Sequence, residues 1–175
     1  MKYYRLAADQ GDAVAQRDLA GIYFHGDGVA QDYTRAAALF KLAADQGEAQ
    51  MDAVIDPALL GRLAEADKAY VRSVSAGGSP VAILRALQRR LDQIGVVQGS
   101  GGDDAALARS GAPRFGPQAD AFKRQVSLWR GRRLDHARQL AFQAERDVKR
   151  SGSPAEALVS ELLIRLARGA AQASR

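Results

Sequence analysis

The sequence predicts an all-α protein, and three observations support this fold class. A ten-residue segment recurs at a spacing that is typical of helical-hairpin repeats. Elsewhere, apolar residues recur every three or four positions, as on one face of a helix. No stretch shows the sustained alternation of apolar and polar residues that a half-buried strand requires. At 175 residues and 47% hydrophobic content, the chain is long enough for one fair-sized domain or two small ones.

The internal repeat lies at the start of the chain. Residues 4–13 return 36 positions later as residues 40–49, and every position is identical or conservatively changed. A period of this length marks a helix-turn-helix solenoid unit. We therefore predict a helix from Ala13 to about Phe24, a glycine-containing turn at 25–28, and a second helix from Tyr33 to Gln46.

This pattern resembles the Sel-one-like repeat, a relative of the tetratricopeptide repeats. The resemblance covers residues 13–48, and residues 1–12 resemble the second half of a preceding unit. Asp32 is placed to cap the second helix. The resemblance implies about one and a half repeat units in residues 1–50, and it rests on Ala15, Gln16, Leu19, Gly21, Tyr23, Gly26, Gly28, Val29, Asp32, Tyr33, Ala36, Phe40, Ala43, Ala44 and Gly47.

The pattern changes from Met51 onward, and we predict a second helical domain over residues 51–175. Gly77-Gly78 and the segment Gly111–Pro117 are expected to interrupt it, and Gln98–Asp104 is expected to be a flexible loop with an aspartate cap at its end. The predicted helices are Met51–Leu60 with a restart at Asp56-Pro57, a helix through Leu63, Ala66, Tyr70 and Val74, Ser79–Val97, Ala105–Arg109, a helix through Phe122, Val126 and Trp129, Leu134–Val148, and a last helix through Leu158, Leu162 and Leu166 that begins with a capping box at Ser153–Glu156.

The helix that begins at Ser79 is expected to organise this second domain. Ser79 suits an N-cap, and proline is tolerated in the first turn that follows. Leu84, Leu87, Leu91 and Ile94 share one face at helical spacing. The arginines of this helix are expected on its other, exposed side, and they are Arg85, Arg89 and Arg90.

A second resemblance covers residues 51 to about 169. The order of four segments is similar to the C-terminal domain of the bacterial DNA polymerase III delta subunit: Ser79–Leu91, Phe122–Trp129, a helix with Glu145 and Lys149, and Gly152–Leu158. That family implies an all-α collar domain of the clamp loader, the assembly that loads the sliding clamp on primed DNA. It implies other loader subunits of the gamma/tau and delta-prime types as partners, an indirect association with DNA, and a place in the DNA-directed DNA polymerase holoenzyme.

The resemblance also has limits. No segment corresponds to the family's clamp-binding N-terminal domain or to its middle domain, so clamp opening is not expected of residues 1–175. The break at Pro113–Gly116 is poorer in aromatic residues than the corresponding stretch of the family. What carries over is assembly through a collar domain.

Composition and motif spacing argue against several classes of site. Without cysteine, the chain has no disulfides and no thiolate metal site, which fits a reducing compartment. No apolar run has the length of a membrane span, and we expect a cytoplasmic protein. His25 and His136 lack partners at motif spacing, and the Gly99–Gly102 run lacks the lysine of a phosphate-binding loop. We therefore predict no catalytic residue, cofactor, metal or small-molecule substrate.

Charge is divided unevenly between the two predicted domains. Residues 1–50 carry a net charge of −2 and residues 51–175 a net charge of +7, which gives +5 for the whole chain. A solvated basic face, an acidic partner subunit and nucleic acid are the three interpretations, and the lack of interleaved aromatic residues argues against a single-strand binding platform. For Trp129 the alternatives are a core anchor and a subunit interface. The candidate interface residues are Arg85, Arg89, Arg90, Trp129, Arg132, Arg133 and Arg138.

Two functions follow from the two resemblances. The first is a non-catalytic clamp-loader collar module that acts in DNA replication by packing against other loader subunits. The alternative is a repeat-based protein–protein interaction scaffold unrelated to replication. DNA binding by residues 51–175 is a third possibility, and it would show a steep dependence of affinity on salt.

Overall fold

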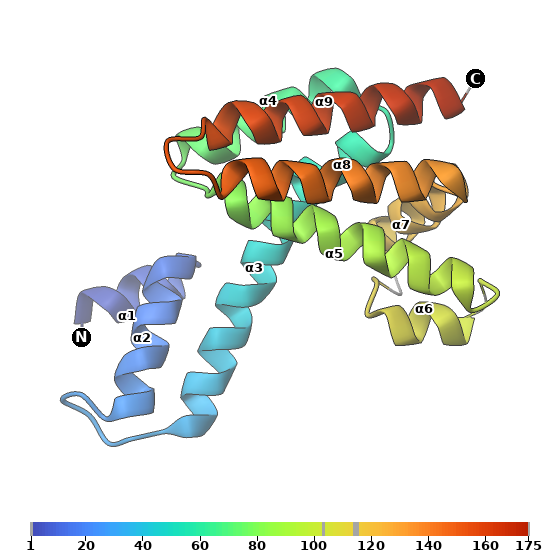
Figure 1. Ribbon diagram of the computed structural model, residues 1–175. Coiled ribbons are helices and arrows are strands. Elements are labelled where there is room, and N and C mark those ends of the chain that lie inside the picture. Colours follow the sequence, from blue (N-terminus) through green and yellow to red (C-terminus); the bar gives the residue numbers. More distant parts are fainter. Residues whose placement is uncertain (1, 103, 114–115, 175) are drawn as a thin grey trace. The chain divides into compact units, whose positions relative to one another are not determined.

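The computed structural model describes residues 2–102, 104–113 and 116–174, and over these ranges the chain forms nine helices and no strand (Figure 1). The all-α prediction is confirmed. Asp103 in the predicted loop and the centre of the predicted break, Arg114 and Phe115, lie outside the described residues. None of the helices seen here combines the length and the apolar character needed to cross a membrane. The helices are α1 Lys2–Asp9, α2 Ala13–His25, α3 Tyr33–Leu59, α4 Leu63–Ser75, α5 Pro80–Gly99, α6 Asp104–Ser110, α7 Gly116–Leu128, α8 Arg132–Val148 and α9 Ala155–Ala173.

The chain divides into two compact units, Met1–Met51 and Asp52–Arg175. In the first unit, α1 packs on α2, and the small core consists of Ala8, Ala15, Leu19, Tyr23 and Ala36. These side chains come from α1, α2 and the first turn of α3. Three of the five are alanines, which let the helices approach closely.

Side-chain caps set the helix ends in the first unit. The backbone N–H of Arg35 donates to Asp32 Oδ1 at 2.9 Å, which confirms the predicted cap. Asp12 plays the same role for α2, because its Oδ1 accepts from Ala15 N at 2.7 Å. Gly26 and Gly28 form the predicted turn with φ angles of 76° and 72°, a conformation that a residue with a Cβ rarely adopts.

α3 is much longer than predicted. We expected one helix to end at Gln46 and another to cover Met51–Leu60 with a restart at Asp56-Pro57, but a single helix runs from Tyr33 to Leu59. Pro57 lies in the last turn, where it removes only one backbone hydrogen bond. Packing compensates for that loss, since Ala58 and Leu59 are completely buried. Asp56 does not cap a new helix, because its carboxylate binds side chains from other helices.

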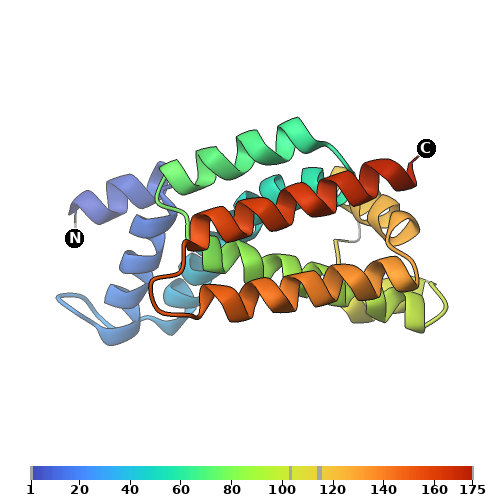
Figure 2. The ribbon, with the colours of Figure 1, turned by 45° about the horizontal axis from the view of Figure 1, so that its top comes forward.

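α5 organises the second unit as predicted. It contacts α6, α7, α8 and α9, while α4 and α8 each pack against α9 (Figures 1 and 2). Its buried face carries Ile83, Leu84, Leu87, Leu91 and Ile94, each at most 1% exposed. Ser79 Oγ accepts from the backbone N–H of Ala82 at 3.4 Å, so the predicted N-cap is confirmed.

The predicted capping box before α9 is wrong. The N-cap position of α9 is Pro154, with no side-chain cap. Ser153 Oγ instead donates to the carbonyl of Val148 at 2.7 Å. Because Val148 is the last residue of α8, its carbonyl has no partner within that helix. The serine therefore completes the end of α8 and is not available at the start of α9.

Candidate interaction site

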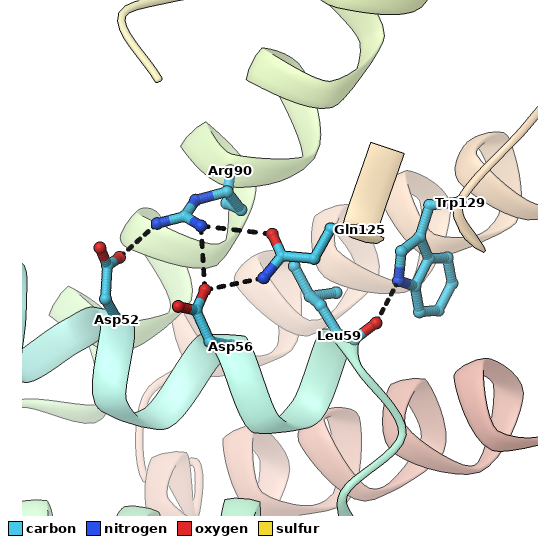
Figure 3. A network of polar contacts seen from close by, with 6 residues as sticks. All are labelled: Asp52, Asp56, Leu59, Arg90, Gln125 and Trp129. Carbon is cyan, nitrogen blue, oxygen red and sulfur yellow. Dashed lines mark hydrogen bonds and ion pairs between the residues drawn. The ribbon is translucent and has the colours of Figure 1, made fainter. Parts of the chain in front are cut away.

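Arg90, unlike the other candidate arginines, lies in a buried polar network (Figure 3). Its guanidinium donates from Nη1 to Asp56 Oδ1 at 2.9 Å and from Nη2 to Asp52 Oδ1 at 2.5 Å. Gln125 completes the network, since its Oε1 accepts from Arg90 Nη1 at 3.2 Å and its Nε2 donates to Asp56 Oδ1 at 2.7 Å. The Arg90 side chain is 6% exposed. The expectation that Arg90 lies on the exposed side of its helix is therefore wrong.

The network has a structural role, because it holds the last two turns of α3 against α5 and α7. A buried arginine is stable only if its charge and its donors find partners, and here two carboxylates and an amide supply them. The guanidinium carbon also lies 5.6 Å from the centre of the Phe122 ring. A signal was present in the sequence: Arg90 falls on the line of Ile83, Leu87 and Ile94 at helical spacing, inside the apolar stripe.

Trp129 is a core anchor, the first of its two predicted roles. It is 2% exposed, and its indole N–H donates to the carbonyl of Leu59 at 2.7 Å (Figure 3). Gln98 Nε2 donates to the carbonyls of Trp129 and of Val126, the latter at 3.0 Å. Leu59 ends α3, so the indole satisfies a carbonyl that the helix leaves without a partner.

Arg138 lies at the seam between α5 and α8. It forms an ion pair with Asp92 at 3.2 Å and donates to the carbonyl of Leu91 at 3.3 Å. A Cβ at Gly95 would stand 2.1 Å from Arg138 Nη2, so a glycine at this position makes room for the guanidinium. Arg138 is therefore partly used in helix packing.

The carboxylate of Glu145 also lies where α5 and α8 meet. Glu145 accepts from Lys149 Nζ at 2.7 Å and from Gln88 Nε2 at 2.9 Å. The predicted Glu145–Lys149 pair is confirmed. These two hydrogen bonds, that of Lys149 first, lower the pKa of the Glu145 carboxyl below its usual value.

The remaining candidate arginines are exposed, on two different parts of the second unit. Arg85 and Arg89 lie on α5 and line a shallow groove of about 590 Å³ that also contains Ser79, Val81, Gln88 and Asp92. Arg132 and Arg133 lie in the first turn of α8, and Arg133 Nη1 donates to the carbonyl of Leu128. The seven predicted residues therefore do not form one surface. Two are in the core, one is in a helix seam, and four are exposed in two places.

Residues 2–102, 104–113 and 116–174 show no cluster of metal-ligating side chains. Within these ranges, no three His, Asp or Glu side chains gather in a way that could hold a metal ion. The two partly buried carboxylates of the Arg90 network, Asp52 and Asp56, both accept hydrogen bonds. What the surface of the second unit offers is exposed arginines beside shallow grooves, an arrangement suited to binding another macromolecule.

Comparisons with known proteins address the first unit. The family model described as Sel1 repeat matches residues 1–12 and 13–48, which are the two segments assigned to repeat units from the sequence. No curated protein and no solved structure matches the chain. The repeat assignment is thus confirmed, and it supports a protein–protein interaction role. The resemblance of residues 51–169 to the clamp-loader family stays a prediction.

Proposed function

We propose that this chain is a non-catalytic assembly module whose second unit packs against other subunits of a clamp-loader-type complex. The observation that carries the proposal is the order of the four resembling segments and the helices they form. The central helix α5 begins within Ser79–Leu91, and α7 ends within Phe122–Trp129, where the tryptophan binds the end of α3. The pair Glu145–Lys149 lies at the end of α8, and Gly152–Leu158 leads into α9.

The described surface fits assembly by helix packing. Arg85 and Arg89 are exposed on α5 beside the groove that begins at Ser79. Neither forms an ion pair within the part of the chain that the structure describes, so both guanidinium groups can pair with carboxylates of another subunit. Arginine suits such an interface, because its planar group binds a carboxylate through two hydrogen bonds. Arg90, one residue further, is committed to the core and so contributes rigidity to α5 and not binding.

Reconstitution with purified loader subunits tests the proposal. The full chain is mixed at micromolar concentration with gamma/tau-type and delta-prime-type subunits, and complexes are measured by size-exclusion chromatography with light scattering. We expect a stoichiometric complex. The double variant R85E/R89E should weaken it, while the double variant K123E/R124E, which changes the charge equally on the exposed side of α7, should not. Absence of a complex with the unchanged chain would overturn the proposal.

The Sel1 repeat match supports a second candidate, a scaffold that binds a partner through the first unit. Leu6 and Leu42 occupy equivalent positions of the repeat and are 59% and 51% exposed. Neither belongs to the small core of this unit, so the variant L6S/L42S should remain folded. If this candidate is correct, a partner captured by the full chain is lost with L6S/L42S and retained with R85E/R89E. The reverse result favours assembly through the second unit.

A further inference from the structure

The structure contains a second cationic groove, and only two of the seven candidate residues, Trp129 and Arg133, line it. It lies between the first half of α8 and the last half of α9 and has a volume of about 540 Å³. Arg133 and His136 form one rim, and Arg165 and Arg168 form the other. Among the described residues, no acidic side chain lines this groove. By contrast, Asp92 lines the groove beside Arg85 and Arg89, and Asp92 and Glu145 line a second groove between α5 and α8.

The rim charges are available to a partner. Arg165 pairs with Glu161 at 2.6 Å, but both side chains are more than half exposed, and such a surface pair exchanges easily. Arg168 and His136 form no ion pair with any carboxylate in the described part of the chain. Arg133 donates to the backbone carbonyl of Leu128, and it too has no ion pair with a carboxylate among those described residues.

The floor of the groove is apolar. Trp129, Leu140, Leu166 and Gly169 contribute to it. A Cβ built at Gly169 would meet the Trp129 ring at 3.7 Å, an ordinary van der Waals contact. The lack of a side chain at Gly169 therefore leaves open a hollow that would accept an apolar side chain.

We propose that the α8–α9 groove binds an acidic amphipathic helix of a partner protein. An apolar ridge would lie over Gly169, and carboxylates on both sides of that ridge would meet the two rims. Charge complementarity selects this occupant, because both rims are cationic and the floor between them is apolar. A helix laid in a groove supplies such a ridge at i, i+3 and i+4 spacing. A nucleic acid would use the rims but not the apolar floor, and Trp129, the aromatic residue of that floor, is only 2% exposed and so offers no ring face for base stacking.

This inference rests on the proposed role as a protein-binding module, but not on the clamp-loader assignment. Its test therefore uses no loader subunit. The probe is a 16-residue synthetic peptide with one stripe of leucine flanked on both sides by glutamate, all at helical spacing. The comparison peptide has the same composition in scrambled order. Binding to the full chain is followed by the indole N–H signal of Trp129 in two-dimensional NMR, since the chain contains a single tryptophan.

Two variants separate charge from shape. R133E/R168E reverses one charge on each rim and should weaken peptide binding at least about tenfold. G169M fills the hollow without changing any charge and should weaken binding to a similar degree. This helical position tolerates a Cβ, and methionine favours helix more than glycine does. R146E is the control, because Arg146 is exposed on α8 and lies ten residues beyond His136, about 15 Å further along the helix axis.

Binding of the ordered peptide with micromolar affinity, lost in both groove variants and kept in R146E, supports the inference. Equal binding of the scrambled peptide, unchanged binding by G169M, or no binding up to millimolar peptide overturns it. A single-stranded DNA oligonucleotide that displaces the peptide and binds more tightly would also overturn it, in favour of a nucleic-acid site. Failure of the loader reconstitution leaves these outcomes unaffected, so the two proposals fail separately.

Discussion

Gly61 brings the turn after α3 into backbone contact with Ala171 in α9. A Cβ atom at Gly61 would stand 2.7 Å from the backbone nitrogen of Ala171 and 2.9 Å from its Cα. Gly61 also has a φ angle of +78°. Two independent constraints, space and backbone conformation, therefore require glycine at this position.

The first prediction is that Gly61→Ala strongly destabilises the second unit. The left-handed conformation costs an L-residue about 1–2 kcal/mol, and forcing apart two packed backbones adds about 1–3 kcal/mol. The control is Gly77→Ala, because Gly77 has a φ angle of +86° but nothing within 4 Å of its Cβ position. Urea unfolding followed by Trp129 fluorescence should show a larger loss for G61A than for G77A. Equal losses would mean that α9 does not pack against this turn.

The second prediction concerns the Arg90 network. In the variant Arg90→Ala, Asp52 and Asp56 lose the guanidinium that balances their charge, and breaking such a buried pair costs about 3 kcal/mol. The matched control is Arg89→Ala, one residue earlier on the exposed side of α5, which should change the free energy of unfolding by less than about 0.5 kcal/mol. Both are measured by urea unfolding. If R90A unfolds at the same urea concentration as R89A, the network does not stabilise the fold.

These two sites show what sequence patterns can and cannot predict. Local signals were sufficient for the Ser79 cap, the buried face of α5 and the hairpin repeat, because each depends on residues close together in the chain. The partners of Arg90 come from α3 and α7, and no local pattern reveals which carboxylate a buried arginine will meet. Ser153 illustrates the same limit, since two helix ends compete for one hydroxyl and only the fold decides between them.

The candidate surface was predicted less well than the fold, for a related reason. The arginines were grouped by density in the sequence, but exposure depends on which side of each helix packs. Arg165 and Arg168 were missed because they lie in a helix that otherwise reads as core. Their spacing of three residues, shared by Arg133 and His136, was the available signal: residues three apart lie on the same face of a helix.

The third prediction concerns the repeat unit. Gln16 is 5% exposed, and its amide links three helices: Nε2 donates to the carbonyl of Ala8 at 3.2 Å, and Oε1 accepts from Gln46 Nε2 at 3.0 Å. In Gln16→Leu, both links are lost, and the Ala8 carbonyl keeps only the hydrogen bond from the backbone N–H of Gly11 at 3.0 Å. Losing two largely buried hydrogen bonds costs about 1–2 kcal/mol. Hydrogen exchange of the α1 and α2 amides in the full chain should accelerate by about fivefold to thirtyfold. Arg17→Ala, at an exposed neighbouring position, serves as control, and exchange equal to that of R17A would contradict the prediction.

The last prediction is a pH dependence set by Tyr70. Its hydroxyl donates to the carbonyl of Glu156 at 2.7 Å, a contact between α4 and α9. Burial, and to a lesser degree the negative charge of Glu156, raises the pKa of Tyr70 from 10.0 to about 12. Between these values the phenol ionises in the unfolded chain but keeps its proton in the folded one. Unfolding therefore releases a proton, and the contribution of Tyr70 is intact below pH 10 and lost as the pH rises toward 12.

Tyr70→Phe separates this effect from other alkaline titrations. At pH 8 the variant lacks one hydrogen bond and should be less stable by about 1 kcal/mol. At pH 11 the unchanged protein has lost part of the Tyr70 contribution and Y70F has none to lose, so the difference in the free energy of unfolding should shrink. Tyr3→Phe, at a position that is 85% exposed, should keep a constant difference from the unchanged protein at both pH values. A Y70F difference that is equally large at pH 8 and pH 11 would show that the phenol of Tyr70 ionises alike in the folded and unfolded chains.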